Sequence, residues 1–219
     1  MCGRYALATE ADELVEAFDL PGLTFAHFAR YNIAPSQDAP VVAEDAQGRR
    51  MGLLTWGFVP QGMDEPGSGF INARSESVQQ KPSFREAFER RRCLVPASGF
   101  YEWKREGRGK VPYWLYPPGG GVISFAGIWE RWERPESPVR HTYAILTTEA
   151  TDDVRPIHDR MPVVVAELDR DLWLNRSSEL RKVSRLLRPP PPGTFRGHPV
   201  SIRVNRPSED DAGLIDPVD

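Results

Sequence analysis

The chain is poor in cysteine and histidine, and both shortages exclude a class of protein. Of its 219 residues only two are cysteine and four are histidine. Two cysteines cannot build the disulfide framework of a small secreted domain, and the histidines stand too far apart for a zinc site. We therefore expect no structural disulfide, no metal and no cofactor. Cys93 falls in a run predicted to be a buried strand, so we assign it no chemistry.

Long apolar runs and net charge are also missing. No apolar run approaches the roughly 20 residues that a membrane-spanning helix needs. No signal peptide precedes Cys2, so we expect a reducing compartment, the cytoplasm. The net charge of −3 gives no global basic field of the kind that many nucleic-acid-binding proteins carry. Any contact with DNA or RNA must use a local patch, and residues 84–110 offer one, with eight Lys or Arg against four Glu.

Short β-type runs are abundant. Hydrophobic residues make up 40% of the chain and aromatic residues 10%, which is enough for the core of one domain. Runs rich in Val, Ile, Phe, Tyr and Trp predict strands at 50–58, 92–96, 99–104, 111–116, 122–130, 140–148, 162–167 and 199–204. The segment EGRG at 106–109 predicts a hairpin turn between two of these strands.

Few segments have a helical pattern. Thr9 and Asp12 resemble a capping box before one helix, Pro82 is placed to open a second, and a third is predicted over 178–187. The elements do not alternate as βαβ units. We therefore predict an α+β fold over residues 1–219, a single domain with a curved, mostly antiparallel sheet or partial β-barrel flanked by a few helices. The acidic tail, about 206–219, is expected to be loose.

The first five residues, MCGRY, carry an unusual chemical possibility. If methionine aminopeptidase removes Met1, Cys2 presents a thiol and an α-amine on adjacent carbons. The amine can condense with an aldehyde to a Schiff base, and the thiol can then close a thiazolidine ring. Ordinary pKa values are about 7.7–8.0 for the amine and about 8.5 for the thiol, so we expect a useful minority of each to be nucleophilic at neutral pH. On these residues alone, a small buried cysteine is the favoured alternative.

Six further segments are unusual for loops that only connect strands, because they combine Trp, Arg, Asn, His and Glu with turn-forming Gly and Pro. They are YNIAPSQ (31–37), TWGFVP (55–60), INARSES (71–77), RRCLVPASGFYEW (91–103), FAGIWE (125–130) and IHDRMPV (157–163). Together with MCGRY they closely resemble the SRAP (SOS response-associated peptidase) family of abasic-site processing proteins, in order and spacing, from Cys2 to about Asn205. The resemblance implies a DNA–protein crosslinker of the DNA damage response. In such a protein the N-terminal cysteine captures the ring-opened deoxyribose of an abasic site in single-stranded DNA as a reversible thiazolidine.

The same resemblance implies catalytic roles for three further residues. Asn72 would hold the amine and the sugar oxygens by hydrogen bonds, and Glu102 would carry protons during Schiff base formation and reversal. His158 would help to open the sugar, and an ordinary histidine pKa near about 6.5 suits proton transfer at neutral pH. Strand alternation turns Glu102 away from Tyr101 and Trp103. The structural alternatives are a strand-end asparagine, a solvated glutamate and a structural histidine.

The resemblance also implies a groove for single-stranded DNA. Guanidinium groups suit phosphates because their planar fork can donate two hydrogen bonds at once. The candidates for phosphate contact are Arg74 and Arg160, with Arg4 and Arg85 as weaker ones. Trp56 and Phe58 would add base stacking to this backbone charge. Solvated surface charge is the alternative for the arginines, and core packing is the alternative for the two aromatic residues.

Two functions of other classes remain open. One is an N-terminal-nucleophile thiol peptidase, in which Cys2 attacks a peptide carbonyl and His158 acts as the base. The other is a noncovalent single-strand binding module in which Cys2 is incidental. Schiff base chemistry at the sugar would also allow weak lyase activity. We expect a monomer, since a site that threads a strand has no need of a partner subunit.

Overall fold

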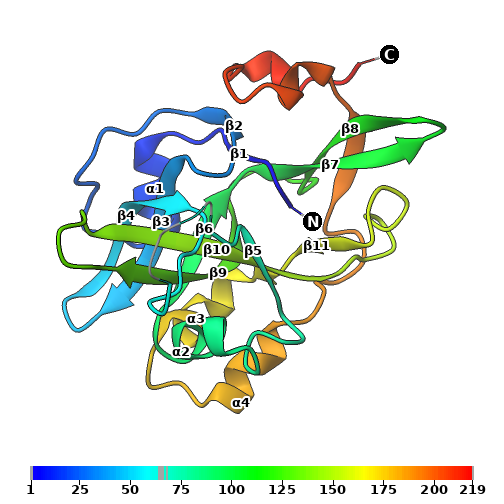
Figure 1. Cartoon of the computed structure of the whole chain (residues 1–219). Helices are drawn as coiled ribbons and strands as arrows, with labels where there is room; N and C mark the ends of the chain where they lie inside the picture. The colour runs from blue at the N-terminus through cyan, green and yellow to red at the C-terminus, as the bar shows by residue number, and fades with distance from the viewer. Residues whose placement is uncertain (1, 64–66, 68, 219) are drawn as a thin grey trace.

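Two β-sheets form the framework of the structure, a computed structural model that describes residues 2–63, 67 and 69–218 (Figure 1). The smaller sheet has the strand order β13-β8-β7-β1-β2, and every pairing in it is antiparallel. Its strands are β1 (Tyr5–Leu7), β2 (Arg30–Ile33), β7 (Gly99–Glu106), β8 (Gly109–Tyr116) and β13 (Arg196–Pro199). The EGRG segment forms the predicted hairpin between β7 and β8, with Gly107 at a φ of 58°.

The larger sheet has the order β11-β10-β4-β3-β6-β9-β12, and β5 pairs with β10 as well. Its strands are β3 (Asp38–Asp45), β4 (Gly48–Trp56), β5 (Asn72–Arg74), β6 (Arg92–Ala97), β9 (Ile123–Trp132), β10 (Arg140–Glu149), β11 (Arg160–Pro162) and β12 (Val164–Val165). A further pairing of β9 with β10 closes β10, β4, β3, β6 and β9 into a ring. Because β10 runs parallel to β4 and β5, this is a ring within a mixed sheet and not a barrel. The predicted single α+β domain with a mostly antiparallel sheet is confirmed.

In the described part of the chain, four short α-helices accompany the sheets: α1 (Ala11–Ala17), α2 (Pro82–Arg90), α3 (Arg170–Leu174) and α4 (Leu180–Val183). Pro82 opens α2 as predicted, since the first helical turn needs no proline N–H. The capping box is wrong. Helix α1 begins at Ala11 after Glu10, with no side-chain cap, and the Thr9 hydroxyl lies 3.3 Å from that of Ser98 instead. Among the described residues, no helix is long and apolar enough to cross a membrane.

The core lies between the two sheets and is rich in aromatic rings. The Trp56 and Tyr143 rings are stacked with their centroids 6.3 Å apart, and Tyr5 meets Trp56 edge-on with the ring centroids 5.2 Å apart. The hydroxyls of Tyr5 and Tyr143 share a buried hydrogen bond of 2.7 Å. Cys93 is fully buried, as predicted, and burial raises the pKa of its thiol. These contacts fix β1, the strand that follows Cys2, against the ring of strands.

The C-terminal part of the chain differs from its prediction in two ways. The strand predicted over 199–204 is instead the end of β13 followed by a 3-10 helix, Ile202–Asn205. The tail is ordered as well, because Leu214 is fully buried in a second cluster with Tyr101 and Trp114. Figure 1 shows this last segment, in red, lying beside β7 and β8. Asp219, also assigned to the loose tail, lies outside the described residues.

Candidate active site

Strand β10 gathers three of the predicted site residues at its carboxyl end. On one side it pairs with β5, where Asn72 stands opposite Ile145 and Arg74 opposite Thr147. On the other side it pairs with β11, where Arg160 stands opposite Glu149. Segments that are about 85 residues apart in the sequence therefore lie on the two flanks of one strand, an arrangement that long-range sheet pairing alone creates.

The N-terminal strand brings Cys2 to this place. Strand β1 pairs with β7, and the backbone N–H of Tyr101 donates to the carbonyl of Arg4 at 2.9 Å. This bond extends the pairing of β1 with β7 by one step, in the direction of Cys2 on one strand and Glu102 on the other. The side-chain amide of Asn72 donates to the Cys2 carbonyl at 2.8 Å. Its oxygen, Oδ1, is buried and has no hydrogen-bond partner among the described residues, so it remains available as an acceptor.

Glu102 and His158 complete the group. Glu102 is only 3% exposed and faces away from Tyr101 and Trp103, which contact the second cluster, as strand alternation predicted. Its carboxylate lies 3.9 Å from Nε2 of His158. The other ring nitrogen, Nδ1, accepts the N–H of Arg160 at 3.0 Å. Since the His158 side chain is 26% exposed, it stands between the buried carboxylate and solvent.

Burial controls the protonation of this site. It raises the pKa of Glu102, and the neighbouring His158 side chain partly opposes that effect. Burial, and after it the carboxylate of Glu102, raises the pKa of the Cys2 thiol well above its ordinary range. The expected minority of thiolate at neutral pH is therefore wrong for this buried state. A reaction at sulfur here needs a base, and Glu102 lies close enough to act on the thiol electrostatically.

The four candidate arginines have very different surroundings. Arg74, and Arg85 on α2, are exposed. Arg160 is mostly buried and donates to both carboxylate oxygens of Glu76, at 2.6 and 2.9 Å, and to the carbonyl of Thr147. Arg4 is half-buried, and one of its guanidinium nitrogens donates to Oδ1 of Asn32 and to the carbonyl of Val204. Sequence reasoning missed Glu76, although it stands in the INARSES segment two residues after Arg74.

Comparison with known proteins identifies the family. The family model described as SOS response associated peptidase (SRAP) matches residues 1–207. The chain belongs to the SRAP family. It is 34% identical over 222 residues to the abasic site processing protein YoqW of Bacillus subtilis, covering 99% of each chain. It is 28% identical to the abasic site processing protein YedK of Escherichia coli, covering all of both chains.

The fold is found in solved structures too. A crystal structure of a protein from Bacteroides thetaiotaomicron superposes with a TM-score of 0.89 over 99% of this chain and all of that one, at 22% identity. That likeness concerns the fold alone. The SRAP match ends at residue 207, so residues 208–218 of the described structure lie beyond it.

Two residues predicted for the DNA groove lie elsewhere in this SRAP structure. Trp56 and Phe58 are both fully buried, and the indole N–H of Trp56 donates to the carbonyl of Ile71 at 2.8 Å. Neither ring offers a face to a base, so the predicted stacking role does not fit the structure. The ring of strands draws these aromatic residues into the core. Phe70, which bridges to Phe58, is 43% exposed. Among the described residues, no group of His, Cys, Asp and Glu is arranged to hold a metal.

The raised pKa of Glu102 has a measurable effect on stability. The folded protein retains a proton that the unfolded chain releases above the ordinary pKa of 4.5, so stability falls as the pH rises from there. We expect Glu102→Gln to remove this cost. The melting temperature of the variant minus that of the wild type should therefore increase from pH 5 to pH 8. Thermal unfolding across that range measures the gain.

Glu76 provides a control of opposite sign. The hydrogen bond from Arg160 lowers the pKa of Glu76, so its charged form adds stability above the ordinary pKa, and this is lost as the pH falls. Glu76→Gln should therefore be less stable than the wild type at pH 8, with a deficit that shrinks in acid. A Glu102→Gln variant that gains nothing between pH 5 and pH 8 would show that burial does not set the protonation of Glu102.

Proposed function

We propose that Cys2, once Met1 is removed, captures the aldehyde of an abasic site in single-stranded DNA as a thiazolidine. The observation that carries this proposal is the convergence of Asn72, Glu102 and His158 on the first residues of the chain. Membership of the SRAP family and similarity to abasic site processing proteins support the same reaction. Met1 itself lies outside the described residues.

The reaction balances without an oxidant or a cofactor. The α-amine adds to the aldehyde carbon of the opened sugar, and loss of one water gives an imine. The thiol of Cys2 then adds to the imine carbon, a carbon–sulfur bond forms, and the thiol proton ends on nitrogen. Holding amine, thiol and aldehyde together makes these steps intramolecular, an effect worth up to about 7–11 kcal/mol. The same imine allows slow β-elimination of the 3′ phosphate, which is the lyase activity we propose.

Each neighbouring side chain has a task that its surroundings support. The open acceptor Oδ1 of Asn72 can take an N–H from the new amine or a hydroxyl of the sugar. Glu102 can accept the thiol proton and return it when the ring opens, since burial gives it a pKa closer to neutrality than an exposed carboxyl has. His158, at the solvent side of Glu102, can exchange protons with water.

The phosphates of the strand need positive charge next to this group. Arg74 follows Asn72 by two residues on β5 and is exposed, so it can reach a phosphate beside the sugar. Arg160 stands on the other flank of β10, but it must exchange the carboxylate of Glu76 for a phosphate. Arg85 offers a further exposed charge on α2. Arg4 is the weakest of the four because its guanidinium is already bonded inside the protein.

Salt dependence tests these phosphate contacts. Arg74→Ala and Arg160→Ala should each weaken binding of all sequences alike and lower the slope of log affinity against log salt by about 0.7. Glu76→Gln is the matched variant. It removes a competing carboxylate and should tighten binding instead. Fluorescence anisotropy with a labelled strand at several salt concentrations measures all three, and unchanged slopes in both alanine variants would place the DNA elsewhere.

One mixing experiment separates the three functional classes. The wild-type protein is incubated with an abasic oligonucleotide, with the same oligonucleotide without the lesion, and with a panel of peptides. A band that survives denaturation only with the abasic strand supports the thiazolidine. Peptide cleavage would support the thiol peptidase instead, and salt-sensitive binding without a covalent product would support the noncovalent module.

A further inference from the structure

The YNIAPSQ segment contains a buried polar side chain that the proposed chemistry does not use. Asn32, in β2, is fully buried. Its side-chain N–H₂ lies within hydrogen-bond distance of three backbone carbonyls of the C-terminal segment, at 3.3 Å from Val204, 3.0 Å from Arg206 and 2.6 Å from Glu209. Its oxygen accepts a hydrogen bond of 2.8 Å from the guanidinium of Arg4. Asn32 therefore joins the end of the chain to its beginning.

Arg4 extends this connection to the reacting residue. The same guanidinium nitrogen donates to the carbonyl of Val204 at 2.7 Å. The backbone carbonyl of Arg4 faces the thiol of Cys2, at 3.8 Å, and accepts the N–H of Tyr101. Both ends of Arg4 are thus held, one by the C-terminal segment and one by β7. Through these bonds Arg4 connects the C-terminal segment with the backbone carbonyl that faces the Cys2 thiol.

Strand β2 and the C-terminal segment also support the strand that carries the Glu102 carboxylate. Tyr101 and Trp103 flank Glu102 on β7 and point to the opposite face of the sheet. The Tyr101 hydroxyl donates to the carbonyl of Tyr31 at 2.7 Å, and the Trp103 indole donates to the side chain of Asn205 at 2.8 Å. Cys2 and Glu102 are therefore backed by one layer of structure behind β1 and β7.

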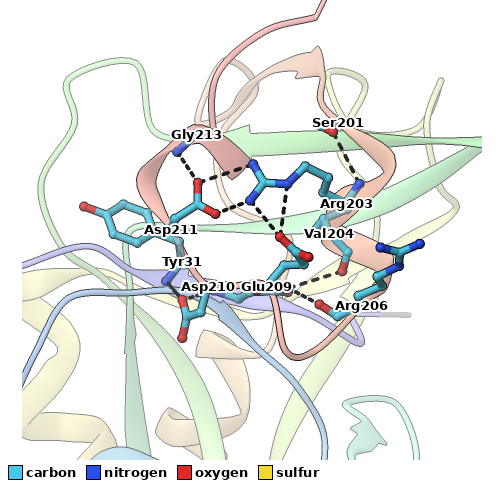
Figure 2. A network of polar contacts seen from close by, with 10 residues as sticks. Tyr31, Ser201, Arg203, Val204, Arg206, Glu209, Asp210, Asp211 and Gly213 are labelled. Carbon is cyan, nitrogen blue, oxygen red and sulfur yellow. Dashed lines mark hydrogen bonds and ion pairs between the residues drawn. The ribbon is translucent and has the colours of Figure 1, made fainter.

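Charge pairs and hydrogen bonds also connect the acidic residues of the C-terminal segment. Figure 2 shows the Arg203 guanidinium between the carboxylates of Glu209 and Asp211. Asp210, between them, accepts the backbone N–H groups of Tyr31 and Asn32 at 2.5 and 3.0 Å. The acidic tail is therefore a set of hydrogen-bond acceptors for β2 and for the C-terminal turn. Glu209, Asp210 and Asp211 lie beyond the residues that the SRAP family model matches.

We infer that Asn32 is a positioning residue for Cys2. It fixes Arg4 against the C-terminal segment, and Arg4 in turn fixes the first residues of β1 so that the thiol stays beside Glu102 and Asn72. The inference concerns the placement of Cys2, and only its consequence for crosslinking rests on the proposed function. It predicts that loss of the Asn32 amide loosens the N-terminus locally, before the rest of the core opens.

Two substitutions separate positioning from general stability. Asn32→Ala removes both the acceptor for Arg4 and the donor to the three carbonyls. Asn32→Asp keeps an acceptor for Arg4 but sets an acceptor against the carbonyls, so it also lowers the melting temperature. If Asn32 holds Cys2 in place through its hydrogen bond with Arg4, Cys2 should be displaced in the alanine variant and should stay in place in the aspartate variant.

Local opening of the N-terminus can be measured without DNA. The two cysteines are alkylated with iodoacetamide, and peptide mass spectrometry gives the labelling rate of each. Both thiols are fully buried in the wild type, and Cys93 reports on the core. We expect Asn32→Ala to speed labelling of Cys2 relative to Cys93 by about tenfold or more, and Asn32→Asp to leave that ratio near the wild-type value. Equal acceleration of both cysteines, or an equal ratio in both variants, would overturn the inference. Should Asn32→Ala not fold, Arg4→Met breaks the same hydrogen bond from the other side and is read in the same way.

The crosslinking rate at saturating abasic strand supplies a second readout. Asn32→Ala should lower this rate, and Asn32→Asp should restore most of it despite its lower melting temperature. A rate that follows the melting temperature in both variants would contradict positioning. A wild-type protein that forms no crosslink would refute the proposed function alone, because the labelling ratio still decides whether Asn32 positions Cys2.

Discussion

Replacing Cys2 by alanine is expected to abolish the denaturation-resistant product with abasic DNA while the noncovalent complex persists. The thiazolidine needs the thiol and the amine on adjacent carbons, so loss of sulfur removes the ring completely. The α-amine and the exposed arginines remain, so strand binding should change little. Cys2→Ser should leave at most an imine, which borohydride can trap. Denaturing gels with and without borohydride distinguish the two variants.

Cys93 provides the matched control. It is a second fully buried cysteine in β6, and a Cβ added to Gly127 would lie 2.8 Å from its sulfur, so it is packed deep in the core. Cys93→Ala removes a thiol without touching the proposed site and should crosslink at the wild-type rate. Intact mass should also show that Met1 has been lost from the crosslinked protein. A stable crosslink on a chain that still carries Met1 would refute the thiazolidine mechanism.

Removing either proton carrier is expected to slow crosslinking by about 10²–10⁴-fold. Burial favours the protonated form of the Cys2 thiol, so its addition to the imine requires a base, and Glu102 is the carboxylate whose charge acts on this thiol. Glu102→Gln keeps the shape of the side chain but cannot take the proton. His158→Ala should slow the forward reaction as well, because it removes the partly exposed side chain that lies 3.9 Å from the Glu102 carboxylate. Strand affinity should be nearly unchanged in both variants.

Single-turnover crosslinking from pH 6 to pH 8 measures the forward rates. Reversal is measured by transfer of the protein from one abasic strand to an excess of another, and Glu102→Gln should slow it too, because the same group acts in both directions. Glu130 is the control, since burial raises its pKa as well but its partner is Arg91. Glu130→Gln should crosslink at the wild-type rate. Wild-type rates of crosslinking and transfer in both site variants would mean that Glu102 and His158 are structural.

Several features could be predicted from the sequence because they depend on short-range geometry. Strand alternation alone turned Glu102 away from Tyr101 and Trp103, and Pro82 marked the first turn of α2. The EGRG hairpin followed from glycine, which tolerates the positive φ that Gly107 adopts. The order of the seven segments was enough to indicate the SRAP family. In the first three cases the deciding residues lie within a few positions of one another, whereas the family resemblance depends on the order of short segments along the whole chain.

Other features could not be predicted because they depend on which distant segments meet. The aromatic residues Trp56 and Phe58 are equally suited to a core or to a stacking surface, and only the closed ring of strands decided for the core. The ion pair of Arg160 with Glu76 joins residues 84 positions apart, and no local pattern indicates it. From its sequence the acidic tail is predicted to be loose. In the structure it is ordered, because Asn32 and the backbone of β2 are hydrogen-bond partners for it.

The sequence by itself determined the chemistry that is available, a thiol and a potential amine on one residue with an asparagine, a glutamate and a histidine elsewhere. Only the tertiary structure decided how that chemistry is controlled. Burial keeps the Cys2 thiol protonated, and the pairing of β1 with β7 sets Glu102 beside it. The physical reason is that a pKa depends on solvation and nearby charge, and both arise from packing between segments that the sequence keeps far apart.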